Sequence, residues 1–288
     1  MEDSIINIYG FASGNAAADS ACCMGPIIME NSKFIKDIPN IEWKSHILPS
    51  YIETQLEAIE GSSIACTKLA KHINSCLTKS QKFTVIGGDH SSAIGTWSGV
   101  SHAANDQIGL IWIDAHLDSH TPNTSATKNI HGMALACLLG HGPEELTNIL
   151  HPKPKLNKEN VVLIGVRDYE PQEQELLNKL GVKIIYMDQV IKDGLPNCFE
   201  EAIEIASKNN SGFGMSIDID GLDPNDAPAT AIKTEPGIKT DELIKVLAEK
   251  IKGNSKFLGL EIAEFFPDYD IEQKTEKVIA EIIKSIYR

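Results

Sequence analysis

The stretch IGLIWIDAHLD, residues 108–118, indicates what kind of fold this chain adopts. Its first six residues are apolar without alternation, which is typical of a strand buried on both faces of a parallel sheet. The apolar run stops at Asp114, and His116 and Asp118 follow at every second position. We therefore expect a buried parallel strand whose carboxyl end carries groups able to bind a metal or a substrate.

Similar apolar runs recur along the chain and alternate with segments of helical spacing. Further strands are expected at 5–11, 83–88, 161–166, 183–187, 214–219 and 257–263. Helices are expected at 51–78, 91–104, 131–140, 171–180, 196–208, 239–252 and 271–287. This alternation indicates an α/β fold with a mostly parallel sheet, and the sequence shows no internal repeat or low-complexity linker. We expect one domain over residues 1–288.

Charge and hydropathy argue against two classes of partner. The 288 residues carry a formal net charge of −14, and the basic residues form no cluster of the kind that binds nucleic acid. No apolar run approaches the roughly 18 residues that cross a bilayer, so we expect no membrane partner. The N-terminal MEDSIINIYGF has acidic residues and no basic segment, unlike a secretory signal, and a cytoplasmic location is expected.

Polar side chains also follow three other expected strands. Asp89 and His90 follow the run 83–88, Asp218 and Asp220 lie at the end of 214–219, and Glu264 follows 257–263. Ligands of open α/β sheets bind outside the carboxyl ends of the strands. These groups and those after residue 113 are therefore expected to meet at one edge of the sheet.

The residue types at this edge favour a metal site. Side chains at i and i+2 of an extended segment point to the same side, about 6.6 Å apart, so Asp114, His116 and Asp118 could line one wall and Asp218 with Asp220 the opposite wall. A lone D-x-D is usually a helix cap or a turn, and His90 alone could be a turn residue. Together, however, so many acids need a counter-charge. Carboxylates mixed with imidazoles suit Mn²⁺, with Fe²⁺, Co²⁺ or Zn²⁺ as less favoured ions, and six ligands suit two metals bridged by carboxylates.

Four blocks of sequence resemble the signatures of the ureohydrolase family, which includes arginase and agmatinase. They are GGDHSSAIG (87–95), IDAHLDSHTPNTSATKNIHG (113–132), SIDIDGLDPNDAPAT (216–230) and GLEIAEFFP (259–267), in the family's order. The resemblance, closest to arginase, implies a single three-layer α/β domain with an eight-stranded parallel sheet. It also implies a homo-oligomer, a trimer or a hexamer, and two Mn²⁺ ions per chain.

The resemblance also implies a role for each residue of the expected site. One metal would be bound by His90, Asp114, Asp118 and Asp218, and the other by His116, Asp114, Asp218 and Asp220. Asp118 would also hydrogen-bond the water shared by the metals, His131 would shuttle protons and Glu264 would pair with the substrate guanidinium. The alternatives are an exposed loop histidine at 131 and a strand-end carboxylate at 264 that pairs with a lysine.

The residues expected to bind the rest of the substrate depart from the arginase pattern. The resemblance assigns this role to His120, Thr127, Asn129 and Glu170. His120 stands where Asn is usual, Thr127 where Ser is usual, Lys128 where Gly is usual and Glu170 where Asp is usual. Hydrolysis of L-arginine to urea and L-ornithine is the expected reaction. Agmatine or guanidinobutyrate as the substrate remains an alternative, as does a metal-binding homologue without turnover.

Overall fold

Eight strands form one parallel sheet in the computed structural model, which describes residues 5–48 and 55–288. The strands are β1 (Ile6–Phe11), β2 (Ile41–Ile47), β3 (Lys82–Gly87), β4 (Ile108–Ile113), β5 (Leu156–Val166), β6 (Lys183–Tyr186), β7 (Phe213–Asp218) and β8 (Phe257–Ala263). They lie in the order β2-β1-β3-β8-β7-β4-β5-β6, and every neighbouring pair is parallel. The prediction of a single α/β domain with an eight-stranded parallel sheet is confirmed.

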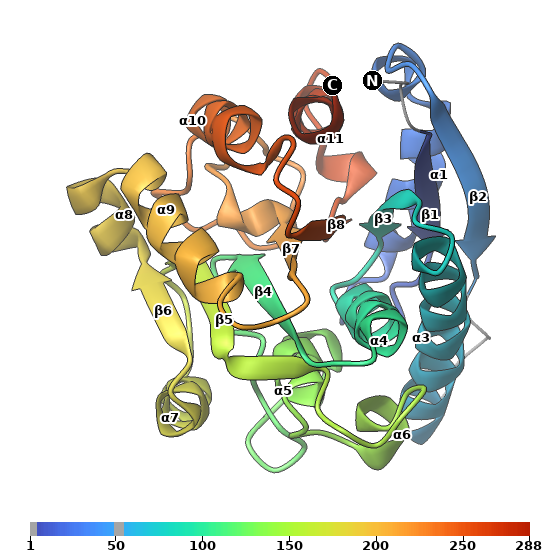
Figure 1. The fold of residues 1–288 in the computed structure, drawn as a ribbon, viewed down its shortest axis with the longest axis vertical. Helices are drawn as coiled ribbons and strands as arrows, with labels where there is room; N and C mark the ends of the chain where they lie inside the picture. Colours follow the sequence, from blue (N-terminus) through green and yellow to red (C-terminus); the bar gives the residue numbers. More distant parts are fainter. Residues whose placement is uncertain (1–4, 49–54) are drawn as a thin grey trace.

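Helices cover both faces of this sheet (Figure 1). One layer contains α3 (Gln55–Leu77), α4 (Ser92–Ala104), α5 (Ala134–Leu138), α6 (Glu144–Thr147) and α7 (Pro171–Leu180). The other contains α1 (Gly25–Asn31), α2 (Lys33–Lys36), α8 (Met187–Asp193), α9 (Leu195–Ala206), α10 (Thr240–Val246) and α11 (Lys274–Tyr287). The 3-10 helices are η1 (Ala21–Met24), η2 (His131–Met133), η3 (Ile219–Gly221) and η5 (Pro267–Tyr269), and η4 (Leu247–Ile251) is a π-helix. Among the described residues, no helix has the length and apolar character needed to cross a membrane.

Burial on both faces explains the unbroken apolar strands. All residues of β4 and β7 are buried. Neither strand therefore has a solvent-facing side on which polar residues would alternate with apolar ones. Gly214 in β7 lies directly under Trp97 of α4, where an added Cβ would come within 2.0 Å of the indole ring. A glycine at this position lets helix and strand approach closely.

The sequence-based boundaries differ from the structure in a few places. The edge strand β2 was not predicted, because its partly exposed residues alternate in burial instead of forming an apolar run. The strand expected at 161–166 begins earlier, at Leu156. The helix expected at 131–140 is divided into η2 and α5, and that at 239–252 into α10 and η4. The helix expected at 51–78 corresponds to α3, and its residues 51–54 lie outside the described residues.

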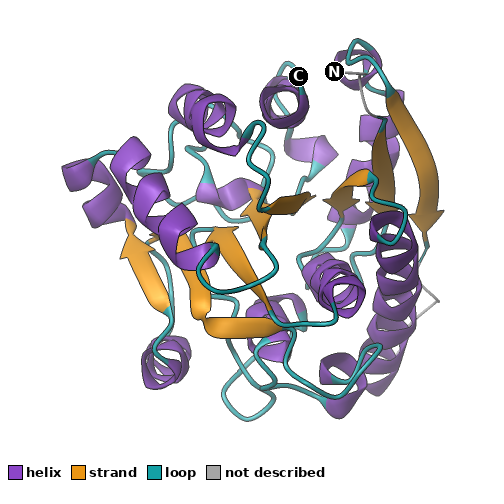
Figure 2. Cartoon of the chain, in the orientation of Figure 1, coloured by secondary structure: helices purple, strands orange, loops and turns teal. Residues whose placement is uncertain are grey.

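The order of the strands creates a crevice at the carboxyl edge of the sheet. Strands β4 and β7 are neighbours in the sheet, but the next strand in the chain lies on opposite sides of this pair. The chain continues from β4 to β5 on one side and from β7 to β8 on the other. Ile113 of β4 pairs with Ile217 of β7, so Asp114 and Asp218 follow side by side. Ligands of α/β sheets bind at such switch points, and Figure 2 shows the loops that leave this region of the sheet.

Candidate metal centre and active site

Four adjacent strands bring the expected polar groups together. Strands β3, β8, β7 and β4 are neighbours in the sheet, and the groups that follow them meet at its carboxyl edge. The residues that we call the Asp/His cluster are His90, Asp114, His116, Asp118, Asp218 and Asp220. All six lie within a small region, in two groups that share Asp114.

The first group surrounds the imidazole of His90. Its Nδ1 lies 3.1 Å from Asp118 Oδ2, 3.1 Å from Asp218 Oδ2 and 3.4 Å from Asp114 Oδ2. The imidazole is buried and stacks on Trp112 of β4, with ring centroids 4.2 Å apart. This stacking leaves the ring little freedom to turn, so Nδ1 stays directed at the three carboxylates.

The second group surrounds the imidazole of His116. Its Nδ1 lies 3.0 Å from Asp220 Oδ2 and 3.4 Å from Asp114 Oδ1. The two oxygens of Asp114 therefore face different histidines, Oδ2 towards His90 and Oδ1 towards His116. Asp114 lies between the two groups, and Trp112 Nε1 holds its Oδ2 with a hydrogen bond of 2.8 Å.

The local backbone is not the extended strand that i, i+2 spacing suggested. Strand β4 ends at Ile113, and Asp114 Oδ1 accepts a hydrogen bond from His116 N at 2.7 Å as the chain bends. Asp218 ends β7 and caps the 3-10 turn η3, with Asp220 N donating to its Oδ1 at 2.9 Å. Carboxylates thus act as turn caps and cluster members at once. The two walls still face each other, because Ala115 N donates to Asp220 Oδ1 at 3.2 Å.

The charges of the cluster are unbalanced without a cation. Burial and the charge of Asp114 raise the pKa of Asp118 to about 7, and burial with Asp220 and Asp114 raises the pKa of Asp218 well above its usual range. His90 Nδ1 and Asp118 Oδ2 are buried and make no hydrogen bond. Buried polar atoms normally have partners, and a divalent cation between oxygen and imidazole donors would supply one here. The residues present therefore fit a metal ion.

A chain of buried groups supports His90 from behind. Nε2 of His90 lies 3.0 Å from Ser216 Oγ, and Ser216 in turn donates to Glu261, which also accepts from Ser92. Sequence reasoning did not identify Ser216 or Glu261. The position of Glu261 inside the apolar run of β8 could have indicated its role, because a fully buried acid requires specific partners.

His131 and Glu264 face each other beside this cluster. His131 Nδ1 lies 3.2 Å from Glu264 Oε1, which also accepts a hydrogen bond from His90 N at 2.8 Å. Burial lowers the pKa of His131, but the Glu264 carboxylate outweighs it and raises the pKa to about 9. The backbone of Ala16 fixes the other side, since His131 N donates to Ala16 O at 3.2 Å. The imidazole is thus held in a defined place and tends to carry a proton.

A cavity of about 300 Å³ opens onto these groups. Of the residues expected to hold the rest of the substrate, His120 and Glu170 line it, whereas Thr127 and Asn129 do not. Thr127 is exposed, and its Oγ1 accepts a hydrogen bond from Asn129 N at 3.2 Å. Lys128, with φ of 64°, donates from Nζ to Pro122 O at 2.6 Å. These loop residues therefore bond to one another and to the loop backbone.

Two more acids line this cavity that were not predicted from the sequence. Asp168 and Glu173 line it together with Glu170. Glu173 is buried and accepts hydrogen bonds from Glu170 N and Ser119 N, both at 3.1 Å. His120 Nε2 lies 3.5 Å from Glu173 and 3.6 Å from Glu170. Glu170 and Glu173 form a capping box at the start of α7, but Glu is not a usual N-cap residue, so the sequence pattern did not indicate this arrangement.

The fold and this site define an enzyme of the ureohydrolase class. The sequence model of the Arginase family matches residues 8–287, so the chain belongs to that family. Arginase of Bacillus subtilis strain 168 is 37% identical over 292 residues, covering 99% of this chain and 98% of the relative.

Solved structures agree with this assignment. The crystal structure of arginase from Bacillus subtilis superposes with a TM-score of 0.91 and 31% identity, covering 99% of this chain and 98% of that one. Entamoeba histolytica arginase, solved in complex with L-ornithine, gives a TM-score of 0.88 at 25% identity and covers 100% and 99%.

Proposed function

We propose that this enzyme hydrolyses L-arginine to urea and L-ornithine at two Mn²⁺ ions. Relatives of nearly equal length carry the name arginase, and the Entamoeba histolytica arginase structure contains L-ornithine, the product expected of this reaction. The observation that carries the proposal is the position of Asp114, whose two oxygens face two different imidazoles. A carboxylate in that position is suited to bridge two ions.

The proposed ligand sets follow the two groups of the cluster. His90, Asp114, Asp118 and Asp218 would hold one ion, and His116, Asp114, Asp218 and Asp220 the other. Oxygen and imidazole donors without a thiolate suit Mn²⁺, with Co²⁺ or Fe²⁺ as alternatives. When bound, the ions supply positive charge that lowers the pKa of a shared water towards neutrality.

The residues beside the cluster would orient the substrate and move protons. The Glu264 carboxylate would accept hydrogen bonds from the planar guanidinium, whose donors match it in pairs. Asp118 would accept a hydrogen bond from the attacking water and hold it in place. His131, with its pKa raised to about 9, carries the proton that the leaving amine needs. All three side chains line the cavity, so a substrate bound there could contact them.

The head group of the substrate would bind at the opposite wall. Glu170 carries negative charge for an α-ammonium group, and His120 offers an N–H to an α-carboxylate. We propose that Thr127 and Asn129 also bind the head group, although neither residue lines the cavity.

Agmatine is the second candidate substrate, because one feature of the cavity favours it. Among the residues that the structure describes, those lining the cavity include Asp168, Glu170 and Glu173 but neither lysine nor arginine. An acidic wall suits a ligand with an amine and no carboxylate. Guanidinobutyrate, which has a carboxylate and no amine, fits this wall least.

Urea release after Mn²⁺ loading tests the proposal. The values of kcat/KM are compared for L-arginine, agmatine and guanidinobutyrate, with the metal content of the same sample measured by elemental analysis. The highest value for L-arginine supports the proposal, and the highest value for agmatine replaces it with the second candidate. Two bound ions without urea release from any of the three would indicate a metal-binding homologue without turnover. Homo-oligomerisation as a trimer or hexamer and a cytoplasmic location remain predictions.

A further inference from the structure

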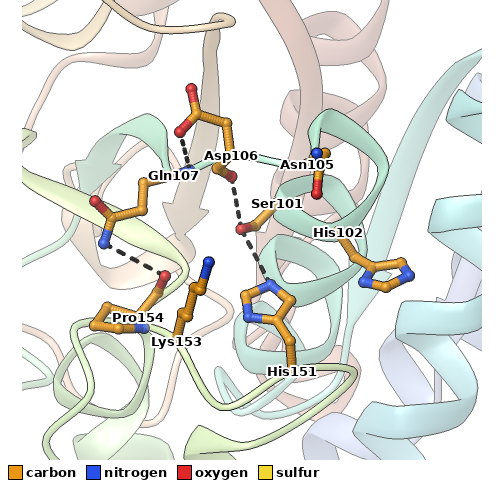
Figure 3. Close-up of a pocket in the computed structure, with 8 residues that line it drawn as sticks. All are labelled: Ser101, His102, Asn105, Asp106, Gln107, His151, Lys153 and Pro154. Carbon is orange, nitrogen blue, oxygen red and sulfur yellow. Dashed lines mark hydrogen bonds between the residues drawn. The ribbon is translucent and has the colours of Figure 1, made fainter.

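A second cavity, of about 480 Å³, lies at the amino edge of the sheet, at the other end of the strands from the Asp/His cluster. We call it the amino-edge cavity. Its walls are the segment 101–107, which joins the end of α4 to the start of β4, and the loop 151–154 before β5 (Figure 3). Because α4 starts beside His90 and β4 ends before Asp114, a full helix and strand length separates this cavity from the cluster.

Several backbone carbonyl oxygens around this cavity already accept hydrogen bonds. Asn105, in the left-handed conformation at φ 52°, ends α4 and donates from its N–H to His102 O, and Asp106 N donates to Ser101 O. Opposite them, the buried Lys155 ammonium donates to the carbonyls of Thr147, His151 and Lys153. The end of α4 and the loop therefore direct few free carbonyl oxygens at a ligand.

The hydrogen-bond donors, by contrast, remain available. Within the described part of the chain, the exposed side chains of Lys153, His102 and Asn105 form no hydrogen bond or ion pair with the protein. Gln107 Nε2 reaches Pro154 O only at 3.5 Å, the long limit of a hydrogen bond. Figure 3 shows the Lys153 side chain between Gln107 and His151, among the residues that line the cavity.

Basic side chains outnumber acidic ones here although the chain as a whole carries −14. Among the described residues that line the cavity, His102, His151 and Lys153 are basic and Asp106 is the one acid. The rings of His102 and His151 stack with centroids 5.9 Å apart. Burial lowers the pKa of His151, and the charges of Lys155, His102 and Lys153 lower it further. A bound negative charge would act in the opposite direction and favour the protonated form of His151.

We propose that the amino-edge cavity is a binding site for a small organic anion that carries a phosphate or carboxylate group. Lys153 and His102 would pair with the anionic group, and the amides of Asn105 and Gln107 would donate to its oxygens or to a polar substituent. The volume lies within the range of small-molecule sites, and it exceeds that of an isolated inorganic ion. The site is separate from the Asp/His cluster and does not depend on the proposed reaction.

Calorimetric titration of the full-length, Mn²⁺-loaded protein tests this proposal, with inorganic phosphate and malonate as separate probes. We expect saturable binding of at least one probe, with a dissociation constant on the order of 1 mM or lower. The probe that binds more tightly identifies phosphate or carboxylate as the preferred group. Lys153→Gln should weaken this binding about tenfold or more, because it removes a charge-assisted contact.

Lys192→Gln is the matched control, because Lys192 is an exposed lysine on α8 and the substitution makes the same change in charge. It should leave the dissociation constant within about twofold, as expected for independent sites. His102→Gln should weaken binding as well, and in ¹³C-labelled protein the probe should shift the ring signals of His102 and His151. Absence of saturable binding to the wild type overturns the proposal. Equal affinity in the wild type and Lys153→Gln also overturns it, because the anion then binds elsewhere, at the metal centre for example.

Discussion

His131 Nδ1 lies 3.2 Å from Glu264 Oε1, and the same oxygen accepts a hydrogen bond from His90 N. One carboxylate therefore links the proposed proton donor to the backbone of a proposed metal ligand. This arrangement fixes the imidazole beside the cluster and keeps it protonated, since Glu264 raises its pKa to about 9.

Replacement of His131 by Asn should slow catalysis while the metals stay bound. The variant loses the proton donor for the leaving amine, so kcat should fall by about 10²- to 10⁴-fold, the usual contribution of general acid–base catalysis. Metal content from elemental analysis and steady-state urea release are the measurements. His141→Asn, at an exposed histidine, is the control and should behave like the wild type. A wild-type rate for His131→Asn would show that His131 is a loop histidine and does not donate the proton.

The His131–Glu264 pair should also make the stability of the metal-free protein depend on pH. The pKa of His131 is raised to about 9 in the folded state, against about 6.5 in an unfolded chain. The pair therefore stabilises the fold fully below about pH 6.5, and this contribution is lost as the pH rises through about 9. The loss is at most about 3 kcal/mol, and less in practice because the imidazole is partly exposed.

Denaturant unfolding of the metal-free protein between pH 6 and about 9.5 measures this effect. The difference in unfolding free energy between the wild type and His131→Asn should shrink with rising pH. Glu264→Gln, which keeps the histidine and removes its partner, should lose the same pH-dependent part. A constant difference across this range would contradict the assignment.

Asp218→Ala should release both metals in large part. Asp218 Oδ2 lies 3.1 Å from His90 Nδ1, and its Oδ1 caps the turn that carries Asp220, so the substitution disturbs both groups of the cluster. Elemental analysis should find well under the roughly two equivalents expected of the wild type. Asp188→Ala, at an exposed aspartate on α8, should keep full occupancy. Two retained equivalents in Asp218→Ala would rule out a bridging role.

Ser216→Ala tests the support behind His90. The substitution leaves Nε2 of His90 and the carboxylate of Glu261 without the hydroxyl that joins them. Loss of such an outer partner typically lowers metal affinity by about 10- to 100-fold. Competition with a chelator measures this affinity. Ser98→Ala is a suitable control, because Ser98 is equally buried and its Oγ has no hydrogen-bond partner. An unchanged affinity in Ser216→Ala would show that Trp112 stacking alone orients the ring.

The sequence was sufficient to predict the fold class and the edge of the sheet at which the Asp/His cluster lies, for a physical reason. Parallel strands buried on both faces have unbroken apolar runs, and each run ends where polar groups begin, as at Ile113–Asp114 and Ile217–Asp218. Since all carboxyl ends of a parallel sheet lie at one edge, locating the ends located the cluster. The edge strand β2 has no such run, because one of its edges has no neighbouring strand and its residues are partly exposed.

Details that depend on tertiary contacts could not be predicted from the sequence. Glu173 reaches the cavity because helix α7 packs its first turn against Ser119, and Ser216 matters only because β7 faces His90. The conformation of loop 121–129 decides that His120 lines the cavity while Thr127 does not. Spacing along a chain does not specify such loop conformations.

Glu170 and His120 should recognise different groups at the head of the substrate. L-Arginine has both an α-ammonium group and an α-carboxylate, agmatine keeps the amine alone, and guanidinobutyrate keeps the carboxylate alone. Glu170 is an anion at the cavity wall, so Glu170→Gln should raise KM for L-arginine and agmatine about 10- to 100-fold and affect guanidinobutyrate little. His120→Ala should do the converse, affecting L-arginine and guanidinobutyrate but not agmatine. In each case kcat should change less than KM, because the head group is remote from the reacting carbon. Glu175→Gln is the control, because Glu175 is exposed on α7, the helix that Glu170 precedes. If both variants alter all three substrates equally, Glu170 and His120 shape the cavity without reading the head group, and His120 acts only through its contact with Glu173 at 3.5 Å.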